Sequence, residues 1–432
     1  MKTCKNFSLQ SWFSIMLLFL SLTSAHEKPQ VPPPPPPTQP SSSNNAPPEL
    51  SSDQNVNKSS SGHVKSNGSS SINVDFKGRF SKVYAFGDSF TDTGNAGAMG
   101  GFKSFMSAVL GHSLFGQSGK TADVSGQRQC NGKLIVDYLC ETLGIAHLQA
   151  YKQSAPDFSS GANFATSGAT ALSKDYFDHH KIANSLMWKE VPDNFMNQIE
   201  WFKQFTKTTG CKGKKDGQCK PEFDDALFWI GGIGGDDFAR IFGSSVGAQM
   251  LTDIAVGQTC NFLEALIEMG AKFLVVQGLP PAGCCPLSMT LNKNKKRDEM
   301  GCSSSANAMI EAYNDLLLKS LGEMRNKHSG CVIIYVDTWE AYKAILKDYK
   351  QYKFVEPFKA CCGYGNGLLN FDLNNLCGST GTSACKNPDE HISWDGIHFT
   401  EAMNRHLADM FFTQKGYCHP SFDALIEPKK GL

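Results

Sequence analysis

The 432-residue sequence has no excess of either charge, because 41 lysines and arginines balance 41 aspartates and glutamates. This balance gives no global field that would favour nucleic acid or an anionic membrane surface. Beyond the N-terminus, no apolar run is long enough to cross a bilayer. The sequence also lacks a C-x-x-C pair, a P-loop and a complete G-x-G-x-x-G pattern. These absences argue against a zinc or thioredoxin motif and against ATP or dinucleotide chemistry.

The first 25 residues have the pattern of an export signal. Lys2 and Lys5 give a positive start, residues 12–22 are apolar, and residues 23–25 offer a small-residue cleavage site before His26. A buried core helix would be the alternative, but a proline-rich tract follows at once. We therefore expect a secreted protein, extracellular or in a cell wall, whose mature chain begins near His26.

Residues 26–78 are predicted to form an unfolded arm. Residues 32–37 are an unbroken proline run, and serine and asparagine dominate the rest. Such a segment buries too little apolar surface to offset the entropy of ordering, so it should be extended, in part as polyproline II. Its two glycosylation sequons begin at Asn57 and Asn67. The arm is either a passive spacer or a contact to a wall or matrix.

The 15 cysteines agree with secretion, because removing Cys4 with the signal leaves an even number. We expect disulfides that pin loops, few free thiols, and no pairing that the sequence alone assigns. The candidates are Cys211 and Cys219, Cys284 and Cys302, and the group Cys361, Cys362, Cys377 and Cys385.

The rest of the chain, residues 79–432, alternates strand and helix patterns. Residues 82–86, 226–230, 272–277 and 331–336 are short apolar runs, typical of a parallel sheet covered on both faces. Amphipathic helices are predicted between them, for example one with Phe195, Ile199 and Phe202 on its buried face. This alternation predicts a doubly wound α/β domain whose ligand site lies beyond the carboxyl ends of the strands.

Polar residues suited to nucleophilic catalysis follow the first strand and precede the last helix. Ser89 comes just after a strand and Gly87, so its hydroxyl can project above the sheet edge. Asp395 and His398 share one loop, and an aspartate can orient a histidine that accepts a serine proton. Taken singly, such residues are more often turn, cap or structural residues.

Two rival nucleophiles are less well supported. Gly243–Gly247 matches the pattern G-x-S-x-G, but no strand precedes it, so we interpret it as the entry to a helix. The adjacent cysteines could supply a thiol, but an oxidising compartment favours disulfides instead.

Four blocks in order resemble the GDSL esterases/lipases, also called SGNH hydrolases, and most closely the secreted plant branch. The likeness spans roughly residues 80–425. The blocks are Gly87–Ser89, Gly161–Ala169, Gly234–Asp237 and Asp395–His398, and residues 358–363 and 393–402 also resemble the C-terminal half of that branch.

The resemblance implies an SGNH-like α/β/α sandwich with a mostly parallel, five-stranded sheet. It implies Ser89 as nucleophile, His398 as general base and Asp395 as the residue that orients it. The backbone N–H groups of Ser89 and Gly168 match two oxyanion donors. It further implies two-step ester hydrolysis through an acyl-enzyme, without a cofactor or metal.

The chain departs from the family pattern at Asp236, which occupies the position of an asparagine that donates to the oxyanion. An ionised carboxylate only accepts hydrogen bonds, and losing one such donor costs about 3–4 kcal/mol of transition-state stabilisation. Activity then requires Asp236 to be protonated, to turn away or to be replaced by water.

A second departure lies in residues 114–133, where only Arg128, Gly132 and Lys133 remain recognisable against the branch's usual stretch. The family resemblance places this segment at the mouth of the active site. It is either a determinant of substrate choice or a surface loop whose sequence has drifted.

The sequence therefore predicts a secreted serine ester hydrolase that acts on an acyl or acetyl ester of a lipid, a small metabolite or a wall polymer. The alternative is a catalytically impaired pseudoenzyme that binds ester-like or glycan ligands, because of Asp236. A third hypothesis is that the proline-rich arm carries the main function and that the protein is a structural component of the wall. Neither nucleic acid nor a transmembrane segment is expected.

Overall fold

The computed structural model describes residues 75–99, 128–181, 193–210, 223–241, 246–293, 296–365, 367–414 and 416–426. Several expectations lie outside these residues. They are the signal, the arm up to residue 74 with Asn57 and Asn67, residues 114–127, Cys211 and Cys219, and residues 243–245 of the G-x-S-x-G match.

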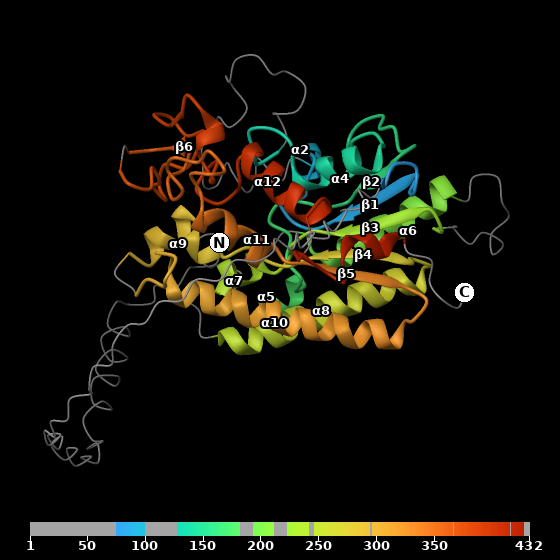
Figure 1. The fold of residues 1–432 in the computed structure, drawn as a ribbon. Helices are drawn as coiled ribbons and strands as arrows, with labels where there is room; N and C mark the ends of the chain where they lie inside the picture. The colour runs from blue at the N-terminus through green and yellow to red at the C-terminus, as the bar shows by residue number, and fades with distance from the viewer. Residues whose placement is uncertain are drawn as a thin grey trace, which may run out of the picture. The chain divides into compact units, whose positions relative to one another are not determined.

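A six-stranded sheet in the order β2-β1-β3-β4-β5-β8 forms the centre of the folded domain (Figure 1). The first five of these strands are parallel, and β8 pairs antiparallel with β5. The predicted parallel sheet is confirmed. The sixth strand was not foreseen, because two residues carry no periodic pattern. The strands are β1 (Lys82–Phe86), β2 (Gly161–Asn163), β3 (Ala226–Ile230), β4 (Phe273–Gln277), β5 (Val332–Val336) and β8 (Cys418–His419).

Helices cover both faces of the sheet, which explains why its strands are continuously apolar. Tyr84 and Phe86 of β1 face a core built with α6 (Phe195–Phe205), α8 (Ala248–Glu268) and α10 (Ser304–Lys327). Val83 and Ala85 face the opposite core, built with α4 (Ile135–Leu143), α11 (Thr338–Lys347) and α12 (Glu401–Phe412). Successive side chains of a strand thus enter different cores, as the two-residue period of a strand requires.

Two helices, α6 and α12, begin at a residue whose side chain caps them. The Thr400 hydroxyl accepts a hydrogen bond from the Met403 N–H at 3.3 Å and starts α12. Asn194 does the same for α6, where Phe195, Ile199 and Phe202 are buried as predicted.

The shorter helices are α2 (Asn95–Ala98), α5 (Lys174–His179), α7 (Gly235–Ile241) and α9 (Pro286–Leu291). Irregular turns are a π-helix (Thr206–Gly210) and 3₁₀ turns (Ala282–Cys284, Pro388–Glu390, Phe422–Leu425), and a small second sheet joins β6 (Cys362–Gly363) to β7 (Ser383–Ala384).

In the described part of the chain, every helix is too short or too polar to cross a membrane.

Disulfides pin the loops as expected, through Cys284–Cys302, Cys361–Cys385 and Cys362–Cys377. The expectation of few free thiols is wrong, however. The described cysteines that form no disulfide include Cys130, Cys140, Cys260, Cys285 and Cys418. Several of these are buried in the apolar core, where a cysteine behaves as a small hydrophobic residue. An even number of cysteines therefore does not indicate which of them form disulfides.

Removing the Cys284–Cys302 bond should destabilise the domain. This bond closes a loop with a sequence separation of 18, for which the chain-entropy relation gives about 3 kcal/mol. We expect the double variant Cys284→Ala/Cys302→Ala to lose about that free energy of unfolding in urea titrations. The matched control is Cys285→Ala, which removes a neighbouring thiol without breaking a disulfide. A double variant as stable as this control would contradict the prediction.

Candidate active site

The structure brings Ser89, His398 and Asp395 together, although Ser89 and His398 are 309 residues apart. The Ser89 Oγ lies 2.8 Å from the His398 Nε2, and the His398 Nδ1 lies 2.7 Å from the Asp395 Oδ2. Ser89 follows β1 at the carboxyl end of the sheet, and the Asp395–His398 loop precedes α12. Such a line of hydroxyl, imidazole and carboxylate can pass a proton from the serine to the histidine.

The loop that carries Asp395 and His398 is held by its own backbone. The Asp395 Oδ1 accepts hydrogen bonds from the N–H groups of Ile397 and His398, at 2.9 and 2.8 Å. Gly396 between them has φ +95°, and a Cβ there would lie 2.2 Å from the Phe371 ring. This turn therefore requires a glycine.

Asp395 is held in its ionised form. Burial raises the pKa of Asp395, but the His398 charge and the hydrogen bonds from His398 and Ile397 outweigh it and lower the pKa below its ordinary value. An ionised Asp395 accepts the Nδ1–H of His398, which leaves Nε2 as the nitrogen that faces Ser89.

Buried amide and carboxylate side chains tie the loop after β1 to the loop after β2. The Asp92 carboxylate accepts from the N–H groups of Gly94, Asn95, Ala96 and Ser167, at 2.6 to 3.1 Å. The Asn95 amide donates to the backbone oxygens of Asn163 and Ala165, each at 2.8 Å. The Asn163 amide in turn donates to the Thr91 oxygen at 2.7 Å. Asn163 lies in one of the sequence blocks, and Asp92 and Asn95 follow another, but the sequence did not reveal their roles because each joins segments far apart in the chain.

Gln198 is a further positioning residue that the sequence did not reveal. It lies buried on α6, where its side chain accepts from the Gly87 N–H at 3.0 Å and donates to the Gly87 oxygen at 2.8 Å. Gly87 has φ +144°, and a Cβ there would lie 3.1 Å from the Gly231 Cα. Gln198 therefore fixes a glycine two residues before Ser89. Along an amphipathic helix, a glutamine gives no signal of such a role.

The first turn of α7 places Asp236 and Asp237 in different surroundings. Asp237 is buried and accepts from the N–H groups of Ala171 and Leu172, at 2.8 and 3.0 Å. It thereby ties α7 to the loop that contains Gly168. Asp236 is half-buried and lines a cavity together with Ser89, Gly168 and His398.

The Asp236 carboxyl is easier to protonate than an ordinary aspartate. Burial raises the pKa of Asp236 to about 6, although the positive charges of Arg240 and His398 counteract it. Burial, followed by the nearby Asp236, raises the pKa of Asp88 well above its usual range. Two neighbouring carboxyls cannot both ionise without cost, so protons are retained at this end of the cavity.

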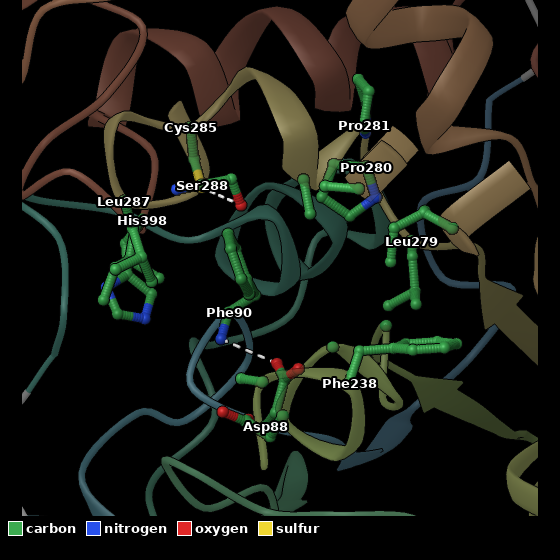
Figure 2. Close-up of a pocket in the computed structure, with 18 of the residues that line it drawn as sticks. Asp88, Phe90, Phe238, Leu279, Pro280, Pro281, Cys285, Leu287, Ser288 and His398 are labelled. Atoms are coloured by element: carbon green, nitrogen blue, oxygen red, sulfur yellow. Dashed lines mark hydrogen bonds between the residues drawn. The ribbon is translucent and has the colours of Figure 1, made fainter. Parts of the chain in front are cut away.

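The cavity itself is about 270 Å³ and mostly apolar. Figure 2 shows His398 and Leu287 on one side of it, with Phe238, Leu279 and Pro281 on the other. The polar groups Asp88, Ser89, Asp236 and His398 also line it. A mainly apolar cleft with a few convergent polar groups is the usual form of a small-molecule site.

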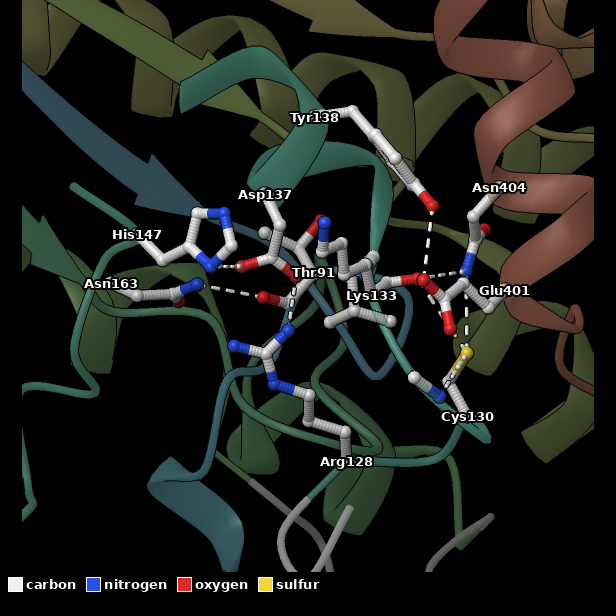
Figure 3. A network of polar contacts seen from close by, with 12 residues as sticks. Thr91, Arg128, Cys130, Lys133, Asp137, Tyr138, His147, Asn163, Glu401 and Asn404 are labelled. Atoms are coloured by element: carbon white, nitrogen blue, oxygen red, sulfur yellow. Dashed lines mark hydrogen bonds and ion pairs between the residues drawn. The ribbon is translucent and has the colours of Figure 1, made fainter. Parts of the chain in front are cut away.

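The recognisable end of the divergent segment serves as an anchor (Figure 3). Arg128 pairs with the buried Asp137 of α4. The Lys133 oxygen accepts from the Asn404 amide of α12 at 3.0 Å. Between these two anchors, Gln129 lines the cavity. The retained residues thus fasten the segment beside the site, while residues 114–127 lie outside the described chain.

Comparisons with known proteins agree with this fold and geometry. Residues 83–411 match the GDSL-like lipase/acylhydrolase family. A GDSL esterase/lipase of Arabidopsis thaliana is 35% identical over 361 residues, which span 81% of this chain and 90% of the relative. A second Arabidopsis GDSL esterase/lipase is 33% identical, over 76% of this chain and 89% of its own length. Acetylajmalan esterase 2 of Rauvolfia serpentina is 31% identical, over 76% of this chain and 88% of its own length.

With a match over most of the chain and relatives above 30% identity, the protein belongs to the GDSL-like lipase/acylhydrolase family, and it is a carboxylic ester hydrolase.

Proposed function

We propose that this protein hydrolyses a carboxylic ester through an acyl-enzyme on Ser89. The observation that carries the proposal is the 2.8 Å contact between the Ser89 Oγ and the His398 Nε2, with Asp395 at 2.7 Å behind the histidine. Ser89 attacks the ester carbonyl while His398 takes its proton and then gives that proton to the leaving alcohol. A water molecule, deprotonated by His398, then releases the acid from Ser89.

The oxyanion that forms in each step needs hydrogen-bond donors. We propose that the backbone N–H groups of Ser89 and Gly168 supply two of them. Asp236 supplies a third when its carboxyl is protonated, because the O–H of a carboxylic acid can donate. Its pKa of about 6 makes this form abundant in mildly acidic solution. A buried carboxylic acid kept neutral as an oxyanion donor has precedent among enzymes.

The substrate class proposed is an acyl or acetyl ester of a lipid, a small metabolite or a wall polymer. The apolar cavity and the similarity to proteins named acetylajmalan esterase support an acyl or acetyl ester of a largely apolar organic molecule. A pseudoenzyme that binds such ligands without turnover is the second candidate, and Asp236 at the donor position is the observation in its favour.

We also propose that the protein is secreted, extracellular or in a cell wall, with the arm as a point of wall association. The signal-like start and the proline run support this. Mass spectrometry of the protein from its source should find a mature chain that begins near His26, with glycans only at Asn57 or Asn67. An intact Met1 would contradict secretion. Wall retention that is lost when residues 26–78 are deleted would support the structural role of the arm.

Ester hydrolysis is tested with purified mature protein and short p-nitrophenyl esters. We expect release of p-nitrophenol at pH 6, and a fall of at least a thousandfold in kcat for Ser89→Ala, because the nucleophile is lost. Equal rates in the two proteins would refute the mechanism. Binding of an ester analogue without any turnover would favour the pseudoenzyme.

The Asp236→Asn variant tests the third oxyanion donor through its pH dependence. Asp236 donates only below its pKa of about 6, so about half of the wild-type molecules are competent at pH 6 and about 1% at pH 8. An asparagine donates at every pH. We therefore expect the ratio of variant to wild-type kcat to rise from about twofold at pH 6 to about a hundredfold at pH 8.

The neighbouring Asp88, Asp237, Arg240 and His398 are present in both proteins, and the variant loses the Asp236 charge that raises the pKa of Asp88 and of Asp237. The control is Ser89→Ala in the Asp236→Asn background, which should be inactive. A variant that is equal to or slower than wild type at pH 8 would show that the donor comes from elsewhere.

A further inference from the structure

We propose that the side of the cavity lined by Phe238, Leu279, Pro280 and Pro281, here called the acyl arm, binds an uncharged acyl chain of about six to eight carbons. This inference rests on the proposed function, because it assigns the two halves of the ester to the two sides of the same cavity. It makes Leu279 a specificity-determining residue.

The assignment follows from the geometry of the tetrahedral intermediate. Its central carbon carries the Ser89 oxygen, the oxyanion, the leaving oxygen and the acyl chain. The leaving oxygen must lie near the His398 Nε2 to receive a proton, and the oxyanion must face its donors. The acyl chain therefore points away from His398. In Figure 2, Phe238, Leu279 and Pro281 lie across the cavity from His398. By contrast, the Leu287 N–H donates to the Gly396 oxygen at 3.0 Å, in the loop that carries His398.

The chemistry of the lining indicates an uncharged chain. The acidic groups Asp88 and Asp236 line the same cavity as Ser89, and no lysine or arginine is among the described residues that line it. A phosphate or carboxylate on the chain would find no counter-charge there. The remaining walls are chiefly aliphatic and aromatic, and each methylene group buried against them is favourable.

The volume limits the length of the chain. An apolar cavity of about 150 Å³ holds a benzene molecule, so the 270 Å³ found here holds roughly ten carbon-sized groups in proportion. Part of that space lies beside His398 and Leu287, where the leaving oxygen and the first atoms of the alcohol must fit. The acyl arm therefore has room for about six to eight carbons.

The wall of the acyl arm is rigid. The Asn314 side chain accepts from the Leu279 N–H and donates to the Leu279 oxygen, each at 2.8 Å. Two prolines follow, and the Gly283 N–H donates to the Asn307 Oδ1 at 2.8 Å. The Cys284–Cys302 disulfide then fixes the next turn. Because this wall is held rigidly, kcat/KM should fall abruptly once the acyl chain is longer than the acyl arm can hold.

The first measurement is kcat/KM for p-nitrophenyl esters from acetate to dodecanoate. For the wild type we expect a rise of up to about fourfold per methylene, the equivalent of 0.8 kcal/mol per buried CH₂, to a maximum at six to eight carbons and a fall beyond. A steady decrease from acetate upward would overturn the proposal while leaving ester hydrolysis intact.

Two matched leucine variants locate the chain. Leu279→Phe fills the acyl arm and should lower the ratio of octanoate to acetate kcat/KM at least tenfold. Leu287→Phe adds the same bulk beside His398 and should change kcat/KM for both esters by a similar factor, so that this ratio stays within about twofold. Each ratio is taken within one protein preparation, so partial misfolding cancels. The opposite pattern would place the acyl chain beside His398 and overturn the assignment.

Binding of octanamide, measured by calorimetry, separates the two proposals. In one outcome, no ester is hydrolysed but octanamide binds, and Leu279→Phe weakens that binding at least tenfold while Leu287→Phe does not. This result would support the acyl arm and refute the proposed function. In the other outcome, esters are hydrolysed but Leu279→Phe changes neither the chain-length profile nor the binding of octanamide. This result would refute the acyl arm and support the proposed function.

Discussion

The position of Ser89 depends on a few buried polar side chains that join the loops at the carboxyl end of the sheet. Asp92, Asn95 and Asn163 are almost fully buried, and their hydrogen bonds cross between the loops after β1 and β2. Leaving one buried donor or acceptor unsatisfied costs about 1–3 kcal/mol, so removing any of these side chains disturbs its partners as well. Gln198 adds a clamp on Gly87 from a helix more than a hundred residues away. Two loops that would otherwise move independently therefore present Ser89 and Gly168 as one rigid surface.

Because these loops are held rigidly, the exchange of an amide nitrogen for a carboxyl oxygen at Asp236 changes the chemistry of the site and not its shape. Aspartate and asparagine have nearly the same shape, so the fold accommodates either one. Asp237 secures α7 to the loop that contains Gly168, whichever residue precedes it. What changes is the electrostatics of the cavity, because burial raises the pKa of Asp236 while Arg240 and His398 oppose that rise. A donor that an amide supplies at every pH becomes, with a carboxyl, a donor that depends on a proton. In the proposed mechanism, Asp236 therefore makes the strength of the oxyanion site depend on pH without any change of backbone.

The surroundings of the cavity divide into a fixed and a divergent part. The wall formed by residues 279–292 is held by Asn314, by Asn307 and by a disulfide, and in our proposal it limits the length of the acyl chain. The divergent part ends at residues 128–133. The ion pair of Arg128 with Asp137 and the hydrogen bond from the Asn404 amide to the Lys133 oxygen fasten this end to α4 and α12. A loop that ends in such anchors can change in sequence without moving Ser89 or His398, and loop variation of this kind lets one scaffold carry different specificities.

The sequence by itself determined the fold class and the residues that meet at the site. Continuous apolar runs predict strands buried on both faces, and the spacing of Phe195, Ile199 and Phe202 predicts the buried face of α6, because such patterns are local properties of the chain. The four blocks indicated Ser89, Asp395 and His398 before any geometry was known. The sequence could not assign roles to Gln198, Asn95 or Asp92, predict β8, or reveal that Cys130 and Cys140 form no disulfide. Nor could it give the pKa of Asp236 or the two sides of the cavity. Each of these depends on which distant groups become neighbours and how much water they lose, and only the tertiary structure decides that.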